Sequence, residues 1–152
     1  MATVSTIVDR PSDLVMEALL DPRTYPRWLV GCRQIRDIDP EWPAPGSRFH
    51  HRFGLAGPLV VDDSSRVVAV EPRRCLQLEV RARPGGRGEA TFTVEPLDPG
   101  RCRVELREVP VGLLAPAGLL LHGPTALRNQ RSLRNLRELV ESVPFDRRGP
   151  RS

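Results

Sequence analysis

The sequence predicts an α+β fold in which a curved antiparallel sheet of about seven strands wraps on one long C-terminal helix. Two patterns predict it. Between residues 32 and 107, short runs of alternating apolar and polar residues are separated by turns rich in Pro and Gly, as expected for strands with one buried face. From Pro124 to about Val143, apolar residues recur every three or four positions, as on one face of a helix. Only this helix is long enough to cover the apolar side of the sheet, so we expect a cavity between the two.

The N-terminal part adds one strand and two short helices. Thr3–Asp9 has a strand-like pattern, and Pro11-Ser12 is typical of the start of a helix. Asp21 is a suitable N-cap for a second helix with Pro22 at its first position, and this helix should end near Trp28.

The middle of the chain predicts six strands. Pro40–Gly46 is a loop, and Gly54–Pro58 is a hairpin turn. The alternation slips near Ser64-Ser65, which predicts a bulge there. The expected strands are Cys32–Ile38, Ser47–Phe53, Leu59–Val70 and the runs 76–81, 90–95 and 101–107.

The C-terminal helix has an apolar stripe with one polar interruption, Asn129. An inward-facing amide is costly unless it is hydrogen-bonded, so a ligand, a water or a neighbouring side chain should bind it. The alternative is that Asn129 faces a water-filled end of the cavity or the rim of the sheet. The stripe consists of Ala126, Leu133, Leu136, Val140 and Val143.

Length and charge limit the possible classes of protein. A chain of 152 residues predicts a single domain, here residues 1–143, followed by a disordered tail, residues 144–152. The net charge is +4, but every basic residue is arginine, and the arginines are spread among acidic residues. Because no aromatic residues alternate with these charges as a stacking platform, we expect no nucleic-acid partner.

Other signals point to an intracellular binding protein without a cofactor. The three cysteines imply no disulfide framework, and we expect a reduced, cytoplasmic protein. The longest apolar stretch, Leu113–Leu121, is far shorter than the ~20 residues that span a bilayer, so no stable membrane insertion is expected. The cysteines and histidines show no metal-ligand spacing, and no phosphate-binding loop is present.

Several short motifs follow one another along the chain in a specific order and spacing. They are Asp9-Arg10-Pro11-Ser12 with Val15, Asp21-Pro22 with Tyr25-Pro26 and Trp28, Pro45–Phe49, Val70–Leu76 and Arg128–Leu136. Together they resemble the helix-grip superfamily (SRPBCC), which includes the birch-pollen-allergen, START and polyketide cyclase/dehydrase domains. The resemblance implies an internal cavity for a hydrophobic or amphipathic ligand, in proteins that range from aromatase/cyclases to lipid carriers and hormone receptors.

His51 is the first candidate for chemistry inside such a cavity. It shares a strand face with Phe49 and Phe53, and a hairpin that pairs residue 51 with about residue 61 places Asp63 diagonally opposite. A carboxylate there would fix the imidazole tautomer and raise its pKa, giving a general acid/base for enolisation, cyclisation or dehydration. The alternative is that His51 is a partly exposed strand residue and that Asp63 begins a loop.

Further residues are expected to line the cavity or its entrance. Tyr25 and Trp28 should pack at the corner formed by the two short helices, either as lining or as plain core. Trp42 is a candidate gate, and Leu113–Leu121 is suited to a cavity mouth, a dimer contact or a membrane touch. The predicted ligand-binding residues are therefore Tyr25, Trp28, Phe49, His51, Phe53, Phe92, Asn129 and Leu133.

Three functions remain open from the sequence. The leading hypothesis is binding, transport or sensing of a small hydrophobic or amphipathic molecule. The second is a cyclase/dehydrase that uses His51 with Asp63; against it, Arg48 and Arg52 fall on the opposite strand face, and Tyr25 is the only tyrosine. The third is a protein-interaction module that uses Leu113–Leu121 and forms a homodimer.

Overall fold

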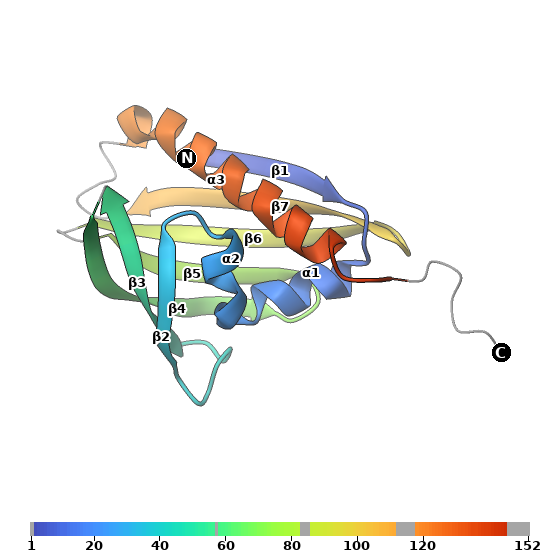
Figure 1. The fold of residues 1–152 in the computed structure, drawn as a ribbon, viewed down its shortest axis with the longest axis horizontal. Helices are drawn as coiled ribbons and strands as arrows, with labels where there is room; N and C mark the ends of the chain where they lie inside the picture. The colour runs from blue at the N-terminus through green and yellow to red at the C-terminus, as the bar shows by residue number, and fades with distance from the viewer. Residues whose placement is uncertain (1, 57, 83–85, 112–117, 146–152) are drawn as a thin grey trace.

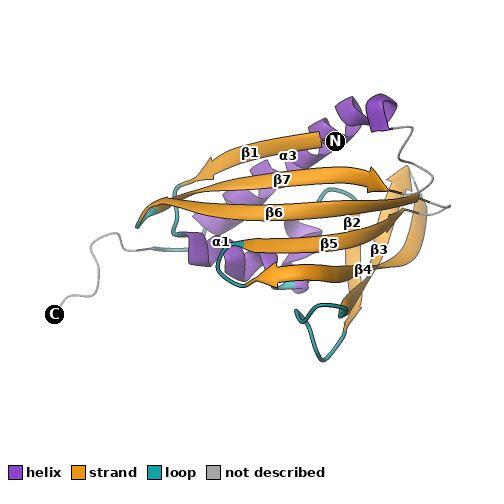
Figure 2. Cartoon of the chain, turned by 180° about the vertical axis from the view of Figure 1, so that it is seen from behind, coloured by secondary structure: helices purple, strands orange, loops and turns teal. Residues whose placement is uncertain are grey.

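The computed structural model describes residues 2–56, 58–82, 86–111 and 118–145. These residues form one seven-stranded antiparallel sheet, in the order β1-β7-β6-β5-β4-β3-β2, with the helices on one face (Figures 1 and 2). The strands are β1 (Ala2–Val8), β2 (Cys32–Ile38), β3 (Arg48–Ala56), β4 (Leu59–Glu71), β5 (Cys75–Ala82), β6 (Gly86–Asp98) and β7 (Arg101–Val111). The helices are α1 (Ser12–Leu19), the 3-10 turn η1 (Pro22–Thr24), α2 (Tyr25–Trp28) and α3 (Gly118–Glu141).

The sheet is strongly curved around the helices. In Figure 1, β2 and β3 run steeply across the direction of β5, β6 and β7, and α3 crosses the other half of the sheet near β1. The predicted architecture, a curved sheet of seven strands wrapped on a long C-terminal helix, is confirmed.

The core lies between the sheet and the helix layer. Alternate residues of the central strands are buried, and they pack against Leu133, Leu136 and Val140 of α3. The expectation that α3 alone covers the sheet is wrong, because α1 contributes fully buried residues as well. These are Val15, Met16 and Leu19.

Three local expectations differ from the structure. Helix α3 begins at Gly118 and includes Pro124, although a proline inside a helix removes one backbone hydrogen bond and crowds the carbonyl four residues before it. The buried stripe ends at Val140, because Val143 lies beyond the helix and is 45% exposed. No bulge occurs at Ser64-Ser65; β4 shifts register between Val67 and Ala69 instead. The apparent slip in the sequence arises because Asp63 and Ser65 are polar although they face inward, while the strand pairing continues without a break.

Polar contacts hold α3 in place at its C-terminal end and in its middle. The guanidinium of Arg10 donates from Nη2 to the carbonyl oxygen of Glu141 (2.5 Å) and from Nε to that of Val143 (3.1 Å). In the middle of α3, the hydroxyl of Ser132 accepts from the backbone N–H of Val30 (3.1 Å), and Asn135 donates to the carbonyl of Trp28 (3.3 Å). These bonds set the position of α3 over the sheet, and with it the face that α3 turns toward the cavity.

Candidate functional site

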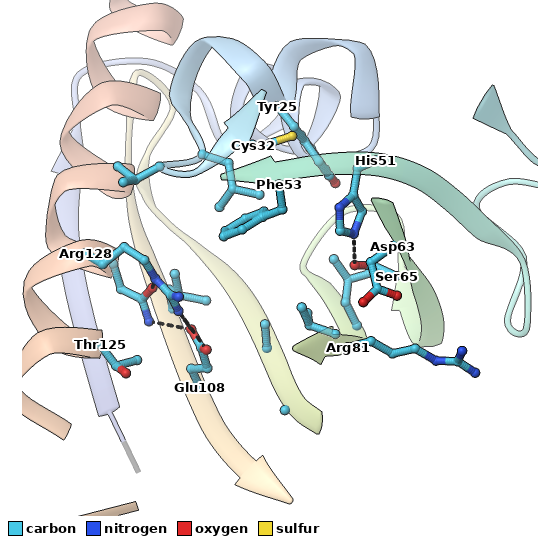
Figure 3. Close-up of a pocket in the computed structure, with 18 of the residues that line it drawn as sticks. Tyr25, Cys32, His51, Phe53, Asp63, Ser65, Arg81, Glu108, Thr125 and Arg128 are labelled. Atoms are coloured by element: carbon cyan, nitrogen blue, oxygen red, sulfur yellow. Dashed lines mark hydrogen bonds and ion pairs between the residues drawn. The ribbon is translucent and has the colours of Figure 1, made fainter. Parts of the chain in front are cut away.

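A cavity of about 300 Å³ lies between the concave face of the sheet, α2 and α3 (Figure 3). Its walls are mainly apolar because the strand residues that alternate toward the helix layer are apolar. The apolar wall includes Phe49, Phe53, Leu78, Val80, Phe92 and Leu106.

Small residues keep part of this space open. Glu108 of β7 is paired with Ala90 of β6 on one side and with Ala2 of β1 on the other. Gly88, two residues before Ala90 on β6, also lines the cavity. A Cβ atom added to Gly88 would lie 3.5 Å from the nearest atom, the carbonyl oxygen of Val109. A larger side chain at Gly88 therefore fits the backbone and reduces the space.

His51 projects from β3 into the cavity. It is 4% exposed, and its Nε2 lies 3.1 Å from the hydroxyl oxygen of Ser65 on β4 (Figure 3). The other ring nitrogen, Nδ1, is buried and has no hydrogen-bond partner among the described residues. The ring packs between Phe49 and Phe53, with centroid distances of 5.3 and 6.1 Å. His51 thus presents one uncommitted polar atom inside an apolar enclosure.

Burial lowers the pKa of His51 below its usual value, and Asp63 opposes that shift without reversing it. Arg36 and His50 add smaller effects that also lower this pKa. Asp63 thus raises the pKa of His51 as expected from the sequence, but the net shift is downward because burial outweighs this contribution. The cost of removing the charged imidazolium from water exceeds the attraction of one carboxylate. His51 is neutral at pH 7.

Asp63 lies directly opposite His51 in the β3–β4 pairing, rather than diagonally as expected. It is a buried residue in the middle of β4 and lines the cavity, so it does not begin a loop. Its Oδ1 accepts from the backbone N–H of Ser64 (2.9 Å). The imidazole bonds to Ser65, a residue that the sequence analysis did not single out; its position two residues from Asp63 on the same strand face was the available signal.

A second polar cluster lines the cavity at α3 and β7. Nη2 of Arg128 lies 2.8 and 2.7 Å from the two carboxylate oxygens of Glu108, and Nδ2 of Asn129 donates to Oε2 of Glu108 (2.9 Å) (Figure 3). Asn129 is 2% exposed, and the carboxylate of Glu108 is the neighbouring side chain that accepts from its inward-facing amide. The sequence pattern alone did not indicate Glu108 and Arg128 as site residues. Glu108 follows Val104 and Leu106 at every second position of β7, and this alternation was the available indication that Glu108 faces the cavity.

Tyr25 and Trp28 line the cavity with their rings, while their polar atoms bind elsewhere. The hydroxyl of Tyr25 donates to the carbonyl of Leu19, and the indole N–H of Trp28 donates to the hydroxyl of Thr24 (3.1 Å). The two rings meet edge to face at 5.1 Å. Burial, the largest cause, raises the pKa of Tyr25 far above its usual value. Both side chains therefore serve as lining and as core.

Leu133 and Trp42 lie away from the cavity wall. Leu133 is fully buried in the core and is not among the residues that line the cavity; it shares the helix face of Asn129 but lies one turn further along α3. Trp42 packs edge to face on Phe49 at 5.4 Å and donates to the carbonyl of Leu20 (2.8 Å); it is not among the residues that line the cavity, and its role as a gate remains a prediction. For the Leu113–Leu121 segment, residues 112–117 lie outside the described residues, and the interaction and dimer hypotheses based on it remain predictions.

Within the described ranges, no group of three or more His, Cys, Asp or Glu residues is arranged to hold a metal ion. Cys32 lines the cavity, and burial raises the pKa of its thiol to about 11. No helix in the same ranges is long and apolar enough to cross a membrane.

The fold and cavity define a helix-grip protein, and comparison with known proteins gives the family. Residues 1–141 match the family described as "Polyketide cyclase / dehydrase and lipid transport", and the chain belongs to it. No curated protein matches the chain.

Solved structures share the fold at low sequence identity. The Zhui aromatase/cyclase from Streptomyces sp. R1128 has a TM-score of 0.70 at 18% identity, covering 92% of each chain. Ara h 8.0201 has a TM-score of 0.70 at 14% identity, covering 93% of this chain and 97% of that one. The di-domain ARO/CYC BexL of the BE-7585A biosynthetic pathway has a TM-score of 0.67 at 23% identity, covering 92% of this chain and 46% of that one.

Proposed function

We propose that the protein binds a small hydrophobic or amphipathic molecule in the cavity between the sheet and α3. The observation that carries this proposal is the apolar cavity of about 300 Å³, which lies at the lower end of the range of small-molecule sites. A few polar groups, His51 with Ser65 and Glu108 with Asn129, are placed within otherwise apolar walls. This combination is typical of sites that bind a ligand by burial and orient it by hydrogen bonds. The family description, which includes lipid transport, agrees with such a role.

Native mass spectrometry of the purified protein, followed by solvent extraction, tests the proposal. We expect a discrete bound mass that is lost or reduced in Gly88→Val, because a branched side chain at this strand position fills the space beside Glu108. Thr91→Val is the matched control, since Thr91 is on the same strand but alternates to the other face. Equal occupancy in Gly88→Val and wild type would contradict a ligand in this cavity.

A second function, acid/base chemistry by His51 on the bound molecule, is favoured by one observation. The buried Nδ1 of His51 has no hydrogen-bond partner among the described residues, and a neutral imidazole is able to take a proton from a bound ligand. The aromatase/cyclases among the structural neighbours agree with this chemistry.

The same mass spectrometry distinguishes binding from catalysis. If His51 promotes a dehydration, His51→Gln protein should carry a molecule heavier by one water than the molecule bound to wild type. If both proteins carry the same mass, the protein binds its ligand without converting it by this route.

A further inference from the structure

We propose that the Glu108–Arg128 pair makes the cavity selective for uncharged ligands that end in a hydroxyl or similar polar group, and against carboxylates. The inference rests on the proposed function, because it concerns which small amphipathic molecules the same cavity accepts. It assigns a specificity role to two residues that are not needed for the apolar burial itself.

The first step is that the charge of Arg128 is already matched. Its Nη2 contacts both carboxylate oxygens of Glu108, at 2.8 and 2.7 Å, and its Nε lies 3.4 Å from the Oδ1 of Asn129. Asn129 in turn donates to Glu108. A ligand carboxylate that approaches Arg128 must therefore compete with a carboxylate held in place by three contacts.

The second step is that Glu108 has no alternative partner across its strand. Its neighbours in the β-ladder are Ala2 and Ala90, whose side chains donate no hydrogen bonds. If the carboxylate of a ligand displaced Glu108 from Arg128, the Glu108 carboxylate would lose its charge partner. The bound ligand would at the same time cover Glu108 and exclude water from it. Leaving a charged group without its partner is costly when solvent is excluded, and this cost is reduced here because the side chains of Arg128 and Glu108 are 38% and 24% exposed.

The third step concerns the other polar end of the cavity. His51 is neutral at pH 7, and the carboxylate of Asp63 lines the cavity beside it. A neutral imidazole gives an anionic ligand group no charge partner. A hydroxyl needs none, because it can donate a hydrogen bond to a ring nitrogen and can accept one from an amide.

Two further arginines, Arg81 and Arg87, also line the cavity. Arg81 and Arg87 are paired across β5 and β6, and they alternate with Val80 and Gly88 of the inward face. Figure 3 shows the side chain of Arg81 extending away from Glu108 and Arg128.

The test compares 1-decanol with decanoate, two probes with the same chain length, by isothermal titration calorimetry at pH 8. The measured quantity is the ratio of the two dissociation constants in each variant, because decanoate is intrinsically better solvated than decanol in water. We expect Glu108→Gln to shift this ratio toward decanoate by roughly tenfold, since Arg128 then carries an unmatched positive charge.

Matched variants give the controls. Glu105→Gln changes a carboxylate of the same strand on the alternate face and should leave the ratio unchanged. The double variant Glu108→Gln/Arg128→Gln should return the ratio toward wild type. Arg128→Gln alone, which leaves Glu108 unmatched, should shift the ratio further toward decanol, and this variant keeps the inference testable if Glu108→Gln does not fold.

Two results would overturn the inference in different ways. An unchanged ratio in folded Glu108→Gln and Arg128→Gln, with both probes still bound, would reject charge selectivity and leave the cavity function standing. Failure of wild type to bind either probe, together with the absence of any co-purified ligand, would reject the cavity function and this inference with it.

Discussion

The Nε2 atom of His51 lies 3.1 Å from the hydroxyl oxygen of Ser65, and both side chains face the cavity from neighbouring strands. We therefore expect Ser65→Ala to lower the free energy of unfolding by about 1–3 kcal/mol, because it leaves a buried imidazole nitrogen without its partner. Urea unfolding followed by circular dichroism measures this loss.

Ser64→Ala is the control for this prediction. Ser64 is the adjacent residue on the other strand face, where its hydroxyl accepts from Nη1 of Arg48 at 3.2 Å in a part-buried position. We expect a loss below about 1 kcal/mol for this variant. Equal losses in the two variants would show that the His51–Ser65 contact adds nothing specific.

The stability of the fold should fall in acid partly because of His51. Its pKa in the folded protein is below the usual histidine value of 6.5, so the unfolded chain binds the proton more readily. The stabilising contribution is fully present above about pH 6.5 and is lost as pH falls toward the lower folded-state pKa. We expect the loss of stability between pH 7.5 and pH 5, measured by urea unfolding, to be smaller in His51→Gln than in wild type. A steeper loss in the variant would contradict this assignment.

Arg10 should contribute more to stability than an exposed arginine near it. Its guanidinium satisfies two carbonyls at the C-terminal end of α3, so Arg10→Ala should lower the free energy of unfolding by about 1–3 kcal/mol. The comparison variant is Arg101→Ala, which removes a surface ion pair with Asp9 (3.3 Å) and should cost less than about 1 kcal/mol. If thermal melts show the same shift for both variants, Arg10 does not cap the helix in solution.

The single tyrosine offers a direct optical test of the core. Burial raises the pKa of Tyr25 above its usual value, and its hydroxyl donates to the carbonyl of Leu19. We expect no tyrosinate absorbance from the folded protein at about pH 11, where a free tyrosine, with a pKa of about 10, is mostly ionised. The same sample in urea serves as the reference. An ionised Tyr25 in protein that is still folded would contradict the buried position.

Tyr25→Phe separates the structural role of this residue from binding. Loss of the bond to Leu19 should cost about 1 kcal/mol of unfolding free energy. Occupancy by a co-purified ligand should not change, because the ring still lines the cavity while the lost hydroxyl binds the backbone of the α1 end. A large loss of bound ligand would mean that the hydroxyl contacts the ligand.

Local pattern was enough to predict the elements and the faces they bury. Alternation in the central strands placed Leu78, Phe92 and Leu106 on the inner face, and the structure has them buried there. The same parity put His51 on the inner face of β3, because a strand turns successive side chains to opposite sides whatever its neighbours are.

Register and long-range pairing were not available from local pattern. β3 continues to Ala56, which pairs with Leu59, so the strands extend into the predicted Gly54–Pro58 turn and His51 pairs with Asp63 instead of with a residue near 61. Likewise, nothing local joins Glu108 to Arg128, which are brought together only when α3 packs against β7.

The sequence by itself determined the order of the strands and helices and the apolar inner face, because these depend on the repeat of a strand or a helix. For His51 and Asn129 it offered an inward position beside an exposed or rim alternative, and the structure decided for the inward one. Only the tertiary structure decided what those polar groups contact: Ser65 for His51, and Glu108 for Asn129 and Arg128. The direction of the pKa shift of His51 was likewise decided only by the tertiary structure. It depends on how much water the assembled sheet and helices exclude, and that is a property of the whole fold.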